Sequence, residues 1–154
     1  MTAETVFVTG ATGYLGSALV PRLLARGHRV LALVRPLAAA VPARVSHFVY
    51  LSVAHPAPVM AAYWEARAEG EALLVAAGFP ATILRPWYVL GPGHLWPYAL
   101  VPFYALAELI PASRAGARRL GLVTRAQMVR ALAAAVENPP DVLHVVEVPA
   151  IRAA

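Results

Sequence analysis

Apolar and polar positions at the start of the chain follow a strand, helix, strand pattern. The apolar, β-branched run at residues 6–8 predicts a strand, and three glycines separate it from a helical pattern that stops at Gly27. A second apolar strand is expected at residues 30–34. Together these segments have the length of one βαβ unit.

The three glycines stand at positions 10, 13 and 16, between the expected strand and the expected helix. In a dinucleotide-binding unit, Gly10 lets the chain turn off the strand and Gly13 lets the backbone approach a pyrophosphate. Gly16 lets the helix lie close to the sheet, and the helix N-terminus offers unpaired N–H groups to phosphates. The alternative is a βα turn without a ligand, and the placement between strand and helix favours the dinucleotide site.

One charged residue indicates which dinucleotide is preferred. In NAD sites an Asp or Glu about 20 residues beyond the glycines holds the ribose 2′-hydroxyl. In this chain the residue 19 positions after Gly16 is Arg35. Because arginine attracts a 2′-phosphate, we predict NADP as the cofactor, with NAD as the alternative. The competing interpretation of Arg35 is a solvated arginine at a strand end.

The remaining pattern continues to alternate between strands and helices. Helix boundaries are indicated by Gly78, in the position that closes a helix, and by Thr124 with Gln127, which form a capping-box pattern. Strands are expected at residues 48–53, 81–84 and 143–148, and helices at residues 59–77, 98–110 and 125–137. Such alternation predicts a mainly parallel sheet with helices on its faces.

Composition limits the chemistry that the chain can perform. Its 154 residues are 60% apolar and 14% charged, which predicts one well-packed domain and excludes a disordered chain. Cysteine and lysine are absent, and Asp141 is the only aspartate. These absences exclude disulfides, thiol nucleophiles and Schiff-base lysines, and we expect no metal site because the histidines share no ligand spacing.

The net charge of +5 raises the alternative of nucleic-acid binding. No zinc spacing, helix-turn-helix pattern or aromatic interleaving accompanies the arginines, so we expect no nucleic-acid partner. Residues 86–107 contain no Asp, Glu or Arg, but repeated prolines and glycines argue against a membrane-spanning helix. Residues 1–5 lack the features of a signal peptide, which predicts a cytoplasmic protein.

Four segments resemble, in order, an atypical or extended short-chain dehydrogenase/reductase, in the group that contains NAD-dependent epimerases and NmrA-like NAD(P)H-binding proteins. They are the G-A-T-G-Y-L-G turn, the strand that ends in Ser52, the segment with Tyr63 and Arg67, and T-I-L-R-P followed by G-P-G at residues 91–93. The resemblance implies a reduced Rossmann-like α/β fold, with a doubly wound, mainly parallel sheet and helices on both faces.

The resemblance also implies roles for individual residues. In the family a Ser, a Tyr and a Lys four positions further on cooperate in hydride transfer, which implies catalytic roles for Ser52, Tyr63 and Arg67. A spacing of four places Tyr63 and Arg67 on one helix face, but arginine replaces the family's lysine and the family's Asn is absent. The cofactor-binding residues implied are Gly10, Thr12, Gly13, Tyr14, Leu15, Gly16, Arg35 and Pro86, and the substrate-contacting residues implied are His94 and Trp87. Packing of the loop is the alternative role for Trp87.

The resemblance covers a shortened form of the family domain. Family members carry two more strands between the segment of residues 1–36 and the segment of residues 48–154, where this chain has only residues 37–47. The central part of the single NAD(P)-binding domain is therefore interpreted as deleted. Removing two strands uncovers apolar faces and a strand edge, so we expect a homo-oligomer formed around residues 37–53 or 98–110.

Three functions remain open on the sequence alone. The first is an NADP-dependent oxidoreductase or epimerase that acts on a small carbonyl or sugar-like substrate. The second is a catalytically silent NADP-binding regulator, which the missing Lys and Asn favour. The third is a truncated remnant that has neither activity and covers its apolar surface by self-association.

Overall fold

A computed structural model describes residues 3–33, 45–57, 59–78, 80–93 and 96–154. The N-terminal unit contains β1 (Thr5–Thr9), α1 (Gly16–Ala25) and β2 (Arg29–Leu33). The middle of the chain contains β3 (Phe48–Leu51), α2 (Ala61–Ala76), β4 (Ala81–Arg85), β5 (Tyr88–Leu90), the 3-10 helix η2 (Trp96–Leu100) and α3 (Val101–Leu109). The C-terminal part contains α4 (Pro111–Arg119), β6 (Leu122–Thr124), α5 (Arg125–Glu137), β7 (Leu143–Glu147) and α6 (Val148–Ala153).

The described strands pair in parallel and form three separate pieces of sheet. β1 pairs with β2, β4 lies between β3 and β7, and β5 pairs with β6. The pairing β1–β2 is the one expected of a βαβ unit, with Thr5 opposite Arg29 and Thr9 opposite Leu33. The structure is thus an α/β fold consistent with a Rossmann-like NAD-binding fold, as the sequence predicts.

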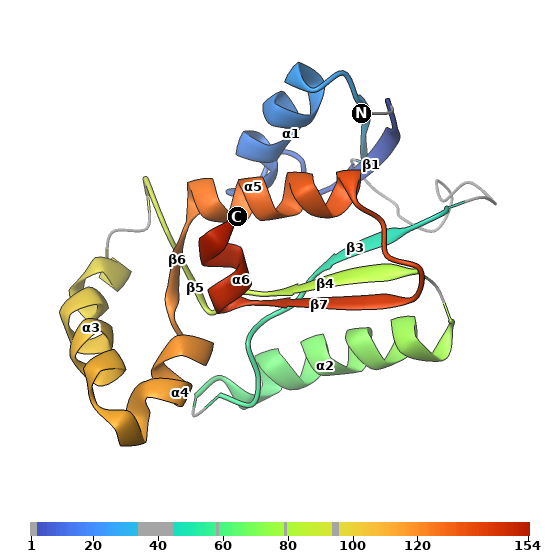
Figure 1. Ribbon diagram of the computed structural model, residues 1–154. Helices are drawn as coiled ribbons and strands as arrows, with labels where there is room; N and C mark the ends of the chain where they lie inside the picture. Colours follow the sequence, from blue (N-terminus) through green and yellow to red (C-terminus); the bar gives the residue numbers. More distant parts are fainter. Residues whose placement is uncertain (1–2, 34–44, 58, 79, 94–95) are drawn as a thin grey trace.

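Helices cover both faces of the β3–β4–β7 sheet (Figure 1). α2 lies along one face, and α5 lies on the other, with α1 and the N-terminal unit beyond it (Figure 1). α1 packs on α5, and Arg26 at the end of α1 donates to Glu137 at the end of α5 over 2.5 Å. The N-terminal unit is therefore connected to the larger sheet mainly through this pair of helices.

The hydrophobic core lies where the two units meet. Val8 of β1 and Leu19 and Leu23 of α1 pack in one buried cluster with residues of β4, β6, α5 and α6. The residues that these elements contribute are Leu84, Val123, Met128, Val129, Ala131, Leu132, Ala133, Ala135, Val148 and Ile151. Burial of these side chains supplies the main stabilisation of the packing between α1 and α5.

Most element boundaries agree with the sequence. α5 has the expected bounds, and both halves of the capping box between Thr124 and Gln127 are present. β3 ends at Leu51, two residues earlier than expected, although the Ser52 N–H still donates to the Leu84 carbonyl over 2.8 Å. Pro86 has no N–H to donate back to this segment, which interrupts the regular ladder, although the Ala54 N–H still donates to the Pro86 carbonyl over 2.8 Å.

The segment expected to be one helix at residues 98–110 is divided into η2 and α3. Pro102 lies in the first turn of α3, where a missing N–H costs little. α4, α6, β5 and β6 were not predicted, because each is short, with nine residues or fewer. Among the described residues, no helix is both long and apolar enough to cross a membrane.

Candidate functional site

The glycine loop between β1 and α1 is shaped by three close approaches of backbone. Gly10 has a φ of 67°, a conformation that favours glycine, and its carbonyl accepts a hydrogen bond from the Gly13 N–H over 2.9 Å. A Cβ at Gly16 would lie 2.1 Å from the Gly10 carbonyl oxygen. Gly16 therefore lets the helix begin directly beside its own loop, whereas we expected it to let the helix approach the sheet.

The middle of the loop is open to solvent. Thr12 and Gly13 are exposed, and a Cβ at Gly13 would lie 3.1 Å from the Gly10 oxygen, so a larger residue there requires the turn to shift by a few tenths of an ångström. At the start of α1, the Ser17 N–H donates to the Gly13 carbonyl over 2.9 Å and the Leu19 N–H donates to the Leu15 carbonyl over 2.9 Å, so main-chain bonds hold the loop against the helix. The predicted pyrophosphate-binding residues Gly10, Thr12, Gly13, Leu15 and Gly16 thus lie together in one short turn at the positive end of α1.

Tyr14 connects the loop to the rest of the molecule. The guanidinium of Arg125, the first residue of α5, lies 5.2 Å from the centroid of the Tyr14 ring. A Cβ at Gly91 would lie 2.3 Å from the Tyr14 hydroxyl oxygen and 3.1 Å from the Arg125 Cβ. Tyr14 is therefore packed between α5 and the end of β5, next to the G-P-G segment that the sequence singles out.

Tyr63 and Arg67 lie together on α2, as their spacing predicts. The Arg67 guanidinium lies 5.3 Å from the centroid of the Tyr63 ring, and its Nη1 donates to the Leu51 carbonyl over 3.5 Å. Burial acts to lower the pKa of Arg67, but interactions with the Tyr50 and Tyr63 hydroxyls outweigh it and raise this pKa. A persistent cation is thus held beside the Tyr63 ring at the end of β3.

Ser52 follows β3 directly and is only 3% exposed. Its hydroxyl makes no hydrogen bond of standard geometry, but it lies close enough to the Glu71 carboxyl to lower the pKa of that group. Because Glu71 is one helical turn beyond Arg67, both residues share the face of α2 that meets the end of β3. The structure therefore brings Ser52, Tyr63 and Arg67 to one part of the fold.

A buried ionic cluster next to Ser52 was missed by the sequence analysis. Glu71, 6% exposed, accepts hydrogen bonds from Arg85 Nε over 3.0 Å and from Arg85 Nη2, and its Oε2 lies 3.3 Å from His55 Nε2. Burial acts to raise the pKa of Glu71, yet Arg85, Ser52 and His55 outweigh it and hold this pKa below its usual value. Arg85 also lies 3.8 Å from Glu147. The cluster thus fixes α2 against the carboxyl ends of β4 and β7.

A simple signal could have revealed this cluster. Glu71 stands eight positions after Tyr63, so Tyr63, Arg67 and Glu71 recur at every fourth residue along one helix face. If this helix face packs on the sheet, the Glu71 carboxylate needs a partner of opposite charge. Arg85 is a candidate for that partner, because it is the charged residue that ends the apolar strand β4. His55 is the second partner of Glu71, and its ring stacks on that of Trp64 with the ring centroids 6.2 Å apart.

Two further predicted residues lie after β4. Pro86 is buried, and its carbonyl accepts a hydrogen bond from the Ala54 N–H over 2.8 Å, so its ring stands beside the Ser52 segment. Trp87 packs edge-on against Tyr88, with ring centroids 5.2 Å apart, which agrees with the alternative that it packs the loop. Arg35 and His94 lie outside the described residues, as does most of the segment at 37–47. In the described part of the chain, no cluster of three potential ligands could hold a metal ion.

Comparison with known proteins supports the family that the motifs indicate. No curated protein sequence matches the chain. Residues 6–68, which include the glycine loop, Ser52, Tyr63 and Arg67, match the sequence model of the NAD dependent epimerase/dehydratase family. The chain from β1 into α2 is therefore similar to that family, which supports nicotinamide dinucleotide binding and an oxidoreductase-like function.

Proposed function

We propose that this protein binds NADP and acts as an oxidoreductase or epimerase on a small carbonyl or sugar-like substrate. The observation that carries the proposal is the Arg67 guanidinium beside the Tyr63 ring, at the end of the strand that leads into Ser52. A bound nicotinamide dinucleotide supplies the hydride acceptor or donor. Arg35 and the glycine loop would hold the cofactor, and Arg35 is the basis of the preference for NADP.

The chain's own residues account for the proton in this reaction. A phenol has a pKa of about 10, so a neighbouring cation is needed for Tyr63 to exchange a proton near neutral pH. Arg67 supplies that positive charge without itself losing a proton. The Ser52 hydroxyl would orient the substrate oxygen, and the Glu71–Arg85 pair would keep Ser52 and α2 in place.

Turnover of NADPH with a panel of small aldehydes, ketones and sugars tests this proposal. Tyr63→Phe should lower any measured rate by about 10²–10⁴-fold while NADPH binding persists, because only the proton donor is removed. Arg67→Lys should retain or raise the rate, because lysine restores the family's pattern. A Tyr63→Phe variant as active as the unmodified protein would show that another group moves the proton.

A catalytically silent NADP-binding regulator is the second candidate. Its supporting observation is that Tyr63 is 44% exposed, whereas a catalytic phenol is usually enclosed with its substrate away from water. Arg67 is also engaged with the Leu51 carbonyl and cannot relay a proton as a lysine can. Tight NADPH binding without turnover of any compound in the panel would favour this function.

We also propose that the domain is a shortened form of the family domain. In a doubly wound sheet the strand before the glycine turn has neighbours on both sides. Among the described strands, β1 has β2 on one edge and no partner on the other, and β3 likewise has only β4. Two unpaired edges at this point support the interpretation that the central strands are missing.

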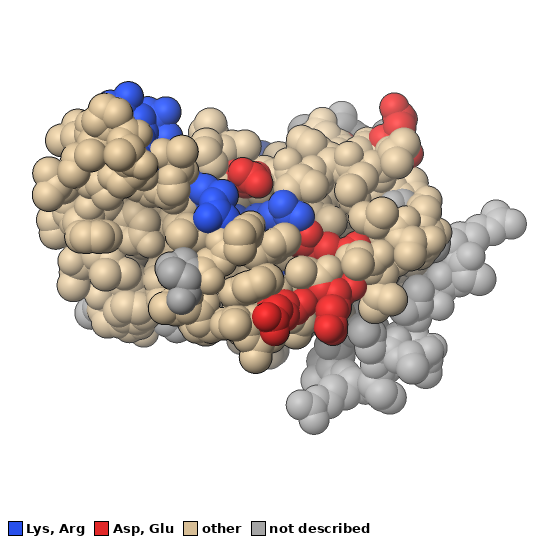
Figure 2. All heavy atoms as spheres, turned by 90° about the horizontal axis from the view of Figure 1, so that it is seen from below, with Lys and Arg blue, Asp and Glu red and all other residues tan. Residues whose placement is uncertain are grey.

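Self-association is the third part of the proposal. At the end of the molecule formed by α3 and α4, Figure 2 shows a wide area without charged side chains, with basic side chains at one edge of it. Large apolar side chains are exposed there, with Phe103 at 67% and Leu109 at 72%. Sedimentation at micromolar concentration should detect a dimer or larger oligomer that Phe103→Ser weakens. A monodisperse monomer would overturn this part of the proposal.

A further inference from the structure

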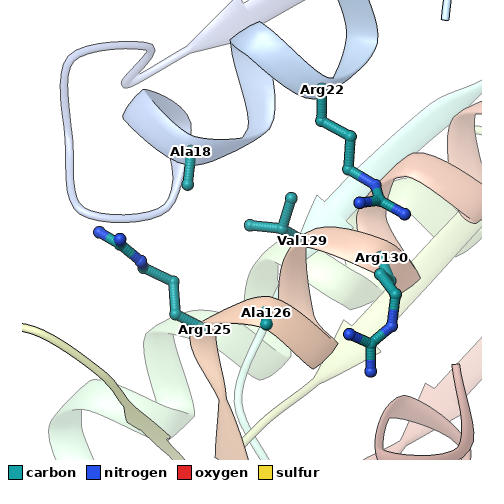
Figure 3. A pocket seen from close by; sticks show the side chains of 6 residues that line it. All are labelled: Ala18, Arg22, Arg125, Ala126, Val129 and Arg130. Atoms are coloured by element: carbon teal, nitrogen blue, oxygen red, sulfur yellow. The ribbon is translucent and has the colours of Figure 1, made fainter. Parts of the chain in front are cut away.

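The groove between α1 and α5 gathers positive charge without a matching acid. It has a volume of about 230 Å³ and is lined by Arg22 of α1 and by Arg125 and Arg130 of α5 (Figure 3). Its floor is made of the small apolar side chains of Ala18, Ala126 and Val129. In the described part of the chain, no Asp or Glu side chain forms an ion pair with any of these three arginines, although Arg130 Nε donates to the oxygen of Ala154, the last residue of the sequence.

The opposite end of the same helix pair provides a contrast. There Arg26 donates to Glu137 over 2.5 Å, and His28 Nε2 lies 3.4 Å from the same carboxylate. At one end of the interface, Arg26 of the N-terminal unit is thus paired with Glu137 of α5. At the other end, Arg22 lines the groove together with Arg125 and Arg130. Like charges gathered in this way repel each other.

The hydrogen-bonding state of the arginines leaves donors available. Arg22 Nε is buried and has no hydrogen-bond partner, which is a costly arrangement for a charged group. Arg130 uses its Nε to donate to the Ala154 main-chain carbonyl over 2.7 Å, and Arg125 stacks on Tyr14. The guanidinium nitrogens that remain are suited to oxyanions, which arginine binds through two parallel hydrogen bonds.

The position of Arg125 adds to the positive potential. It is the first residue of α5, and the first turn of this helix contains no acidic residue. A helix N-terminus carries partial positive charge, so an arginine is unfavourable there unless an anion is near. Arg125 points toward the loop that precedes α1, while Arg22 and Arg130 lie toward the other end of the groove (Figure 3).

We propose that this groove binds a small organic oxyanion with at least two negative charges, at a site separate from the glycine loop. Arg125 would hold one anionic group, and Arg22 and Arg130 the other, with the short apolar floor of Ala18, Ala126 and Val129 between them. Binding neutralises the repulsion among the three arginines and compensates the charge at the start of α5. Both carboxylate and phosphate groups satisfy these requirements, and the test separates them.

Calorimetric titration of the full chain at constant ionic strength tests the proposal with two probes, glutarate and pyrophosphate. At least one probe should bind saturably, while acetate, which has a single charge, should bind more weakly. Arg22→Gln and Arg130→Gln should each weaken binding by about tenfold or more, because each removes a charge-assisted hydrogen bond. Arg118→Gln is the matched control, because Arg118 is an exposed arginine of α4 outside the groove, and it should bind as the unmodified protein does.

Gly13→Val separates this site from the dinucleotide site. A valine there obstructs the glycine loop, so the variant should lose NADPH binding and keep the oxyanion. If Gly13→Val abolishes both, the probe binds the glycine loop and the groove proposal is wrong. Absence of saturable binding by either probe, or equal weakening by Arg118→Gln, also overturns it. If Arg22→Gln does not fold, Arg130→Gln alone tests the proposal. Arg130 is partly exposed, so its replacement should leave the fold intact.

Discussion

The strand before the glycine loop and the strand before Pro86 have opposite environments. β4 is paired on both edges, and its residues 81–84 are all buried. β1 is paired on one edge, and Val8 is its only buried residue. The glycine loop nevertheless has its complete shape. Its turn depends on contacts within residues 10–16, whereas the positioning of Ser52 depends on the buried sheet around β4.

This difference indicates that the two regions with predicted functional residues are supported in different ways. The glycine loop is local, and its unit rests on α5 through α1. The part with Ser52, Tyr63 and Arg67 is supported by the Glu71–Arg85 pair and by the core. Changes in the core should therefore affect stability and the Ser52 region first, and changes in the loop should affect cofactor binding alone.

The largest effect should come from truncating the buried strand. Leu84→Ala should lower the free energy of unfolding by about 2–5 kcal/mol, because Leu84 is completely buried in the core cluster. Leu31→Ala is the matched change in β2, whose Leu31 is half-buried, and should cost about 1 kcal/mol. Urea denaturation measures both values. If Leu84→Ala and Leu31→Ala lower the free energy of unfolding equally, the β1–β2 and β3–β4–β7 sheets do not differ in burial as described.

A smaller effect is expected from the residue proposed to select NADP. Arg35→Asp should shift the preference from NADPH toward NADH by about 1.5–3 kcal/mol, because it replaces a charge-assisted hydrogen bond with repulsion. Arg29→Asp, at the other end of β2, is the control and should leave the ratio of the two affinities unchanged. If both variants change this ratio alike, net charge rather than Arg35 determines the preference.

The smallest effect should appear as a pH dependence of stability. The pKa of Glu71 is held below its usual value of 4.5 in the folded protein by Arg85, Ser52 and His55. The stabilisation from the Glu71 charge is therefore complete above pH 4.5 and is lost as the pH falls through the folded pKa. Glu71→Gln should lower stability at neutral pH and reduce the additional loss in acid. Thermal unfolding between pH 7 and pH 3 measures this. If the melting temperatures of the two proteins fall in parallel between pH 7 and pH 3, the Glu71 charge contributes nothing to the pH dependence of stability.

The sequence predicted the parts of the fold that local patterns determine. The glycine turn, α5 with its Thr124 cap, and the Tyr63–Arg67 pair each depend on residues close together in the chain. The spacing of Glu71 behind Tyr63 and Arg67 could have indicated that Glu71 needs a cationic partner. That Arg85 is this partner depends on the packing of α2 against β4, which local patterns do not show. The arginine groove escaped prediction for the same reason, since Arg22 and Arg130 are far apart in sequence. Roles for Arg35 and His94 stay predictions.

Cofactor binding is the central claim, and calorimetric titration with NADPH and NADH tests it most directly. The account predicts saturable binding of both, tighter for NADPH, and loss of both in Gly13→Val with the fold retained. Gly116→Val is the matched control, because a Cβ at this helical position meets nothing within 4 Å, and it should bind both cofactors normally. Absence of binding by the unmodified chain, or unchanged binding by Gly13→Val, would contradict the claim.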